Sequence, residues 1–81
     1  MNKLSHLDLD GTRITDLGIQ FMTAMTSLQV LDLRGTHVTD KGIARLGNLR
    51  GLRHVYLFDT PVTDAGIKAL QQRLPNAKLM R

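Results

Sequence analysis

The feature that most constrains this chain is a block of thirteen residues that occurs three times without a gap, each copy beginning 24 residues after the last. The copies are LSHLDLDGTRITD from Leu4, LQVLDLRGTHVTD from Leu28 and LRHVYLFDTPVTD from Leu52. A fixed period of roughly 20–50 residues is typical of proteins that stack one structural unit on the next. The chain is therefore expected to form a stack, and its function is expected to be that of a surface.

Each block begins with the pattern of a half-buried strand. Apolar residues alternate with polar ones, which is the period of a strand that has one buried face. The residues expected to point inward are Leu7, Leu9, Leu31, Leu33, Val55 and Leu57. The chain must then turn, at Gly11, Gly35 and Asp59, where a positive φ is tolerated. The threonine that follows in each block (Thr12, Thr36, Thr60) is placed to hydrogen-bond backbone groups where strand pairing stops.

A helix is expected after each turn. The sequence Thr-Asp-x-Gly-Ile ends each block, and a Thr or Asp just before an i, i+3 apolar pattern is typical of a helix N-cap. The glycine in the first turn is disfavoured by propensity but occurs three times, so it is expected to let adjacent helices approach closely. The apolar helix positions are Ile19, Met22, Met25, Ile43, Leu46, Leu49, Ile67, Leu70 and Leu74.

These patterns predict an α/β solenoid of three 24-residue strand–turn–helix repeats, with a short parallel sheet on the concave face and helices on the convex face. The repeats cover about residues 4–27, 28–51 and 52–76, and residues 77–81 have room for a stub of a fourth strand. No linker or second domain is visible, so residues 1–81 are interpreted as a single domain.

The pattern Leu-x-x-Leu-x-Leu-x-x-Thr-x-Ile/Val resembles a leucine-rich repeat, with Thr12, Thr36 and Thr60 where that family more often has Asn or Cys. Its continuation, Gly-Thr-x-Ile/Val-Thr-Asp-x-Gly-Ile, is similar to a bacterial subtype abundant in planctomycetes and related to the repeats of F-box proteins. The last repeat looks like those that follow other domains, including cytochrome c-like ones, in larger proteins. The resemblance implies protein–protein recognition through the concave face, and it implies no catalytic residues and no cofactor.

Composition excludes several classes of protein. There is no cysteine among the 81 residues, so disulfides, thiolate nucleophiles and cysteine metal sites are absent. No apolar run is long enough to span a membrane, and the N-terminal residues lack the apolar core of a signal peptide. If Met1 is the true start, the chain is expected in the cytoplasm. The net charge is +4, and eight of the eleven basic residues lie from Lys41 onward.

One group of residues in the expected first strand could have a chemical role. His6, Asp8 and Asp10 alternate, so all three are expected to project from one face. A histidine with two carboxylates could hold a divalent metal or serve acid–base chemistry. Because the corresponding residues of the next repeats do not complete such a site, the preferred interpretation is that they are ordinary outward positions. No enzyme activity and no metal site are predicted.

The outward strand positions are instead the predicted partner-binding surface on the concave face. They run from acidic residues to basic and aromatic ones, and Tyr and Arg are enriched in interface hot spots. The surface consists of His6, Asp8, Asp10, Val30, Asp32, Arg34, His54, Tyr56 and Phe58. Anchoring is expected from Arg34, Tyr56 and Phe58, and the aspartates are expected to steer basic groups of a partner. The other interpretation is that the aromatic residues cover the end of the stack or meet a neighbouring repeat.

Three further hypotheses remain open. The repeats could be a structural or capping segment of a larger protein with no ligand of their own. A basic convex patch could bind an acidic ligand or nucleic acid, although no accompanying motif favours it, and a solvated helical face is the preferred account; its residues would be Arg45, Arg50, Arg53, Lys68, Arg73 and Lys78. Two copies could also pair end to end through the first or last strand and bury the exposed apolar face.

Overall fold

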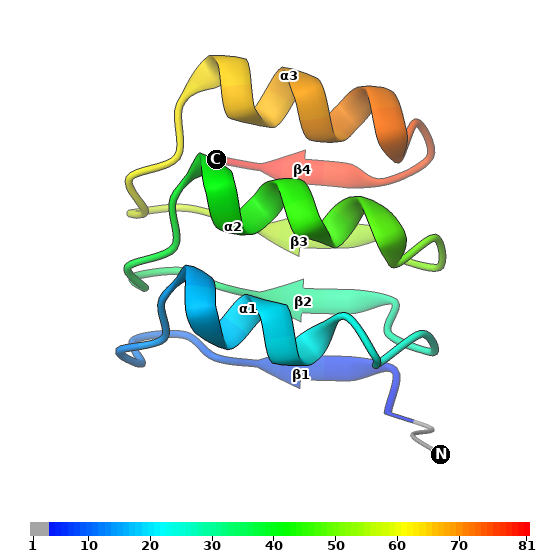
Figure 1. The fold of residues 1–81 in the computed structure, drawn as a ribbon, viewed down its shortest axis with the longest axis horizontal. Helices are drawn as coiled ribbons and strands as arrows, with labels where there is room; N and C mark the ends of the chain where they lie inside the picture. Colours follow the sequence, from blue (N-terminus) through cyan, green and yellow to red (C-terminus); the bar gives the residue numbers. More distant parts are fainter. Residues whose placement is uncertain (1–3) are drawn as a thin grey trace.

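The computed structural model describes residues 4–81, and in this part of the chain four parallel strands form one sheet that is covered by helices on one side (Figure 1). The strands follow the chain in the order β1-β2-β3-β4. The elements are β1 (His6–Asp8), α1 (Asp16–Met22), β2 (Val30–Asp32), α2 (Asp40–Ala44), the 3₁₀ helix η1 (Arg45–Asn48), β3 (His54–Tyr56), α3 (Asp64–Arg73) and β4 (Lys78–Met80). The predicted α/β repeat solenoid, with strands on one side and helices on the other, is confirmed.

The register of the sheet places equivalent residues of successive repeats side by side, in rows that cross the strands. Each strand pairs with the next at a separation of 24 residues, so Leu7 lies opposite Leu31, Leu31 opposite Val55, and Val55 opposite Leu79. Residues of one sequence column therefore lie side by side across the sheet. Because side chains alternate between the two faces of a strand, every second column faces the helices and the columns between them face away.

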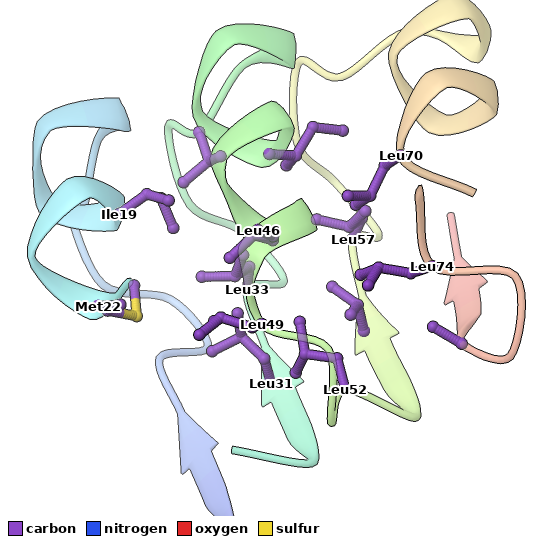
Figure 2. Packing of buried hydrophobic residues seen from close by; sticks show 14 of the residues in the cluster. Ile19, Met22, Leu31, Leu33, Leu46, Leu49, Leu52, Leu57, Leu70 and Leu74 are labelled. Atoms are coloured by element: carbon purple, nitrogen blue, oxygen red, sulfur yellow. The ribbon is translucent and has the colours of Figure 1, made fainter. Parts of the chain in front are cut away.

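The core lies between the sheet and the helices (Figure 2). It is most complete in the second repeat, where Leu31, Leu33 and Ile43 have no exposed surface. In the first repeat, Leu7 and Leu9 are only partly buried, because no described residue packs on their outer side. This difference is the expected consequence of stacking, since the terminal unit of a solenoid has a neighbour on one side only.

The turn after each strand has the predicted conformation. Gly11, Gly35 and Asp59 have φ angles of 74°, 69° and 61°. The threonine that follows each of them donates its hydroxyl to the carbonyl oxygen three residues earlier, at 2.8, 2.7 and 2.7 Å in successive repeats. These hydrogen bonds satisfy carbonyl groups at the point where the chain leaves the strand.

Successive helices are joined by an aspartate–threonine clasp that the N-cap interpretation missed. Asp16 accepts the backbone N–H of Thr39 at 2.7 Å and its hydroxyl at 2.5 Å. Asp40 accepts the same groups of Thr63 at 2.8 and 2.5 Å. The threonines do occupy the N-cap positions, but only the Thr63 side chain accepts a capping hydrogen bond, from the Gly66 N–H. In each clasp the carboxylate therefore accepts hydrogen bonds from the next repeat.

The clasp explains the glycine in the first turn of α2 and α3. A Cβ atom on Gly42 would overlap the Asp16 carboxylate, and one on Gly66 would overlap that of Asp40. The expectation that these glycines permit close approach between adjacent helices is confirmed. The close approach is made by the aspartate of the preceding repeat.

The helical segments differ in length between repeats. The α1 helix has 7 residues, α2 has 5 and is followed by the four-residue η1, and α3 has 10. Arg73 of α3 lies over Gly47 in η1 and donates hydrogen bonds to the Ala44 carbonyl at 3.4 Å and to Asn48 Oδ1 at 3.2 Å. Within residues 4–81 no helix combines the length and the apolar character needed to cross a membrane.

Candidate functional site

The nine residues predicted to bind a partner lie together on the side of the sheet that faces away from the helices, which we call the open sheet face. They form three rows that cross the strands, because residues 24 apart are in register. His6, Val30 and His54 form the first row, Asp8, Asp32 and Tyr56 the second, and Asp10, Arg34 and Phe58 the third, just beyond the strand ends.

Strand β4 adds two residues to this face that the sequence prediction missed. Lys78 is in register with His54, and Met80 is in register with Tyr56, so they extend the first and second rows. The assignment of Lys78 to a basic convex patch was therefore wrong, because its strand position places it with the outward columns of the sheet. The signal was weak in the sequence. Only Leu79 fits the apolar columns, whereas Asn76 and Arg81 stand where the other repeats have leucine.

Just beyond the end of β2, Arg34 is held in place by Asp32. The Arg34 Nε lies 2.9 Å from Oδ1 and 3.1 Å from Oδ2 of Asp32, and Nη2 lies 2.7 Å from Oδ2. Asp32 also accepts the Arg34 backbone N–H at 3.1 Å. This two-point contact fixes the plane of the guanidinium group. Hydrogen bonding to the Arg34 side chain lowers the pKa of Asp32, and burial opposes that shift without reversing it.

The guanidinium group of Arg34 also meets an aromatic ring and a second carboxylate. Its central carbon lies 5.7 Å from the centre of the Tyr56 ring, within the range of a cation–π interaction. Its Nη2 lies 3.5 Å from Oδ2 of Asp10. The pKa of Arg34 is raised, first by its hydrogen bonds to the Asp32 side chain. Although it is anchored on both sides, the Arg34 side chain keeps 45% of its surface exposed.

The structure gives Asp32 a different role from the one predicted. Asp32 is only 9% exposed and its carboxylate is bound by Arg34, so it positions Arg34 and is not free to steer basic groups of a partner. Asp8 and Asp10 are exposed, and Asp8 accepts the Asp10 backbone N–H at 3.0 Å. The acidic character that reaches the surface therefore comes from Asp8 and Asp10.

The acidic group that the fold assembles differs from the predicted one. Oxygen atoms of Asp8, Asp10 and Asp32 lie within 4.8 Å of one another, whereas the expected member His6 makes its described side-chain contact with Ser5, at 3.1 Å. Arg34 contacts two of the three carboxylates. Arg34 therefore supplies one positive charge to this group of three carboxylates, through its contacts with Asp32 and Asp10.

The aromatic residues lie on β3 and just after it, in the column next to the one that contains Arg34. Tyr56 is half-buried, with β2 on one side of its strand and β4 on the other, and Phe58 is 44% exposed. The interpretation that Tyr56 covers the end of the stack was wrong, because β4 lies beyond it. An exposed phenylalanine next to a positioned arginine is a combination suited to contact with another molecule.

A hollow lies where the helices return to the strands. It has a volume of about 230 Å³ and is lined by Arg50, Leu52, Arg73 and residues 74–77. Arg73 is already engaged with Ala44 and Asn48. The described residues therefore offer no set of convergent polar groups there that compares with the one on the open sheet face.

Comparison with known proteins agrees with this geometry. A family model described as Leucine Rich repeat matches the chain three times, at residues 1–22, 24–47 and 49–70. Together these matches cover most of the sequence and follow its repeats. A search of curated proteins found no match.

Proposed function

The chain belongs to the leucine-rich repeat family, and from this premise we propose that it is an interaction module whose protein partner binds the open sheet face. Repeats of this family generally mediate protein–protein interaction. Within the family, the sequence from Gly35 to Gly42, Gly-Thr-x-Val-Thr-Asp-x-Gly, favours a bacterial subtype.

The observation that carries this proposal is the fixed position of Arg34. Binding requires side chains to lose conformational freedom, which costs about 0.5–1.5 kcal/mol for each long side chain that becomes ordered. Asp32 and Tyr56 already order Arg34 in the free protein, so a partner that contacts Arg34 avoids most of that cost. Arginine and tyrosine are also the residue types that contribute most to binding energy at interfaces.

The two sides of the open sheet face favour different groups on the partner. Asp8 and Asp10 make the β1 side acidic, whereas Tyr56, Phe58 and Met80 form an apolar area on the β3–β4 side, next to His54 and Lys78. Strands in a sheet lie about 4.8 Å apart, so the acidic and aromatic columns are separated by roughly 10 Å. A segment in the polyproline II conformation spans that distance in about three residues, and because it has three residues per turn, its side chains three positions apart lie on the same face. The best-fitting partner segment has a basic side chain and an apolar side chain about three positions apart.

The test is a selection of binders from a displayed library of random peptides, followed by affinity measurements with purified variants. Selected peptides should be enriched in the predicted basic and apolar pair. Phe58→Ala and Tyr56→Ala should each weaken their binding at least tenfold, which corresponds to about 1.4 kcal/mol. Arg34→Lys should also weaken it, because lysine cannot keep the two-point contact with Asp32.

Lys68→Ala is the matched control, because Lys68 is an exposed residue of α3 on the helical side. It should change the affinity less than twofold. Peptides that bind the Phe58→Ala and Tyr56→Ala variants as tightly as the parent protein, or that are lost with Lys68→Ala, would show that the open sheet face is not the binding surface.

A structural role is the second candidate, and the first repeat provides the observation that favours it. Gly42 and Gly66 accommodate the aspartate of the preceding repeat, whereas a Cβ on Gly18 would meet Ile14 of its own repeat. Thr15 and Gly18 thus repeat the residue types that receive an aspartate in the other two repeats, which suits a role in stacking.

A further inference from the structure

The first repeat carries large apolar side chains on its surface at positions where the other repeats do not. Leu17 and Phe21 of α1 are 65% and 76% exposed. The corresponding residues of α2 and its 3₁₀ extension are Lys41 and Arg45, and those of α3 are Ala65 and Ala69; all are exposed. These columns are exposed in every repeat, so the stacking of repeats does not require leucine or phenylalanine there. An exposed apolar pair of this kind indicates contact with another surface.

The same repeat presents an unpaired strand edge. Leu9 N–H donates to the Asp32 carbonyl and Gly11 N–H donates to the Arg34 carbonyl, at 2.8 Å each. The odd-numbered residues of β1 therefore direct their main-chain groups toward β2. The even-numbered residues, His6 and Asp8, direct theirs away from the sheet, where no described strand pairs with them.

This edge is complementary to itself. If a second copy approaches in the antiparallel sense with a two-fold axis at Leu7, His6 lies opposite Asp8 of the second copy, and Asp8 lies opposite His6. The main-chain groups of these residues then form the closely spaced hydrogen-bonded pairs of an antiparallel ladder. A histidine and a carboxylate also meet at each of the two positions, which is a favourable cross-strand pair. The axis runs perpendicular to the sheet, so both α1 helices remain on the same side.

We propose that two copies of this chain pair through the β1 edge to form one continuous eight-stranded sheet, with Leu17 and Phe21 of the two α1 helices closing the helical side. The interface is isologous, because each copy offers the same surface to the other. The assembly leaves the open sheet faces of both copies uncovered, and of the residues on that face only His6 and Asp8 also take part in the cross-strand pairs.

The opposite end of the stack lacks these features. The exposed positions of α3 carry small or polar residues such as Ala65, Lys68 and Ala69, and no large apolar one. Beside them, Arg81 pairs with Asp64 at the end of the chain. Lys78 lies in the edge strand β4 itself, and lysine in an edge strand opposes pairing with another chain. The choice of β1 over β4 follows from this difference.

A single introduced cysteine tests which edge pairs, because the chain has none of its own. Leu7 and Leu79 occupy the same column at the two edge strands, β1 and β4. At the two-fold axis the Cα atoms of residue 7 would lie about 4.5 Å apart, within the range that a disulfide spans. Under mild oxidation, Leu7→Cys should give a disulfide-linked dimer on a non-reducing gel and Leu79→Cys should not. Cross-linking of Leu79→Cys alone, of both variants equally, or of neither would overturn the proposal.

A second measurement does not depend on substituting a half-buried leucine. Light scattering on the unmodified chain should show the mass rising from 9.0 kDa toward twice that value as concentration increases. The Leu17→Lys/Phe21→Arg variant places the residues of the second repeat into the first, so it should fold normally. It should remain monomeric up to a concentration at least tenfold higher than the parent chain does. Ala65→Lys/Ala69→Arg adds the same charge at the matching positions of α3 and should dimerise like the parent chain. A monomeric parent chain at all concentrations, or equal effects of the two variants, would refute the β1 interface.

Discussion

Removal of one clasp should destabilise the whole stack, and Asp40→Ala is the perturbation that measures the effect. Asp40 accepts two hydrogen bonds from Thr63, one from the backbone and one from the hydroxyl. The hydrogen bond from the Thr63 side chain, followed by that from its backbone, lowers the pKa of Asp40. Hydrogen bonds to a charged group contribute about 1.5–3 kcal/mol when well shielded. Because this site is near the surface, we expect a total loss of about 2 kcal/mol.

Gly66 provides an internal check on that reasoning. In the parent chain Gly66→Ala should be destabilising, because its Cβ would overlap the Asp40 carboxylate. In the Asp40→Ala background only the Cβ of residue 40 remains, 3.0 Å from the added Cβ, so alanine should recover part of its helix preference over glycine, which is about 1 kcal/mol. The two substitutions should therefore be strongly non-additive, with a coupling energy above about 1 kcal/mol.

Urea unfolding followed by circular dichroism measures all four members of this cycle. For a slope of about 1 kcal/mol per molar urea, a loss of 2 kcal/mol lowers the midpoint by about 2 M. Asp64→Ala is the matched control, because this aspartate of the same column is 94% exposed and pairs only with Arg81 among the described residues; its midpoint should move by less than about 0.5 M. Equal midpoints for Asp40→Ala and Asp64→Ala, or additive effects of Asp40→Ala and Gly66→Ala, would refute the clasp as a source of stability.

The remaining predictions concern pH, the turn and the core. The folded-state pKa values of Asp32 and Asp40 are lowered, so the stability that they contribute is present above the unfolded value of about 3.9 and is lost as pH falls through the folded values. At pH values below about 4 the urea midpoint of the parent chain should therefore decrease, and that of Asp40→Ala should decrease less. Asp59→Gly should raise the free energy of unfolding by about 0.5 kcal/mol, because Asp59 has a positive φ; a lower midpoint would contradict this. Leu33→Ala should cost about 3 kcal/mol, and Leu9→Ala of the same column distinctly less, since Leu33 is fully buried and Leu9 only partly; equal costs in urea unfolding would argue against a less packed first repeat.

The layers of the fold could be predicted from the sequence because each depends on a pattern that the repeat displays three times. Alternation identified the inward strand positions, and the Gly11 column identified a turn with positive φ. The hydroxyl of Thr36 and its equivalents bonds the backbone as expected. These properties are local, so the residue types within one repeat are sufficient to specify them.

The contacts between repeats could not be predicted in the same way. The Asp16 carboxylate accepts a hydrogen bond from Thr39 of the next repeat. A sequence period shows which residues are equivalent, but it does not show which atoms are in contact. Asp32 was expected at the surface, but it is covered because Arg34, two residues later, folds back over it. The sequence did contain one indication of this contact, because Asp32 and Arg34 are two positions apart along an extended segment and their side chains therefore share a face.

The three repeats also indicate, by internal comparison, which columns build the stack and which provide its surfaces. The columns of Leu33, Thr36 and Asp40 are identical in all three repeats, and they contain the core, the turn and the clasp. The columns of Arg34 and Phe21 differ in every repeat, and they lie on the open sheet face and on the outer side of the helices. Identical columns cannot distinguish one part of the surface from another, so recognition has to come from the columns that differ. Because the clasp and the core do not involve those columns, substitutions there should alter the partner or the assembly while leaving the stack intact.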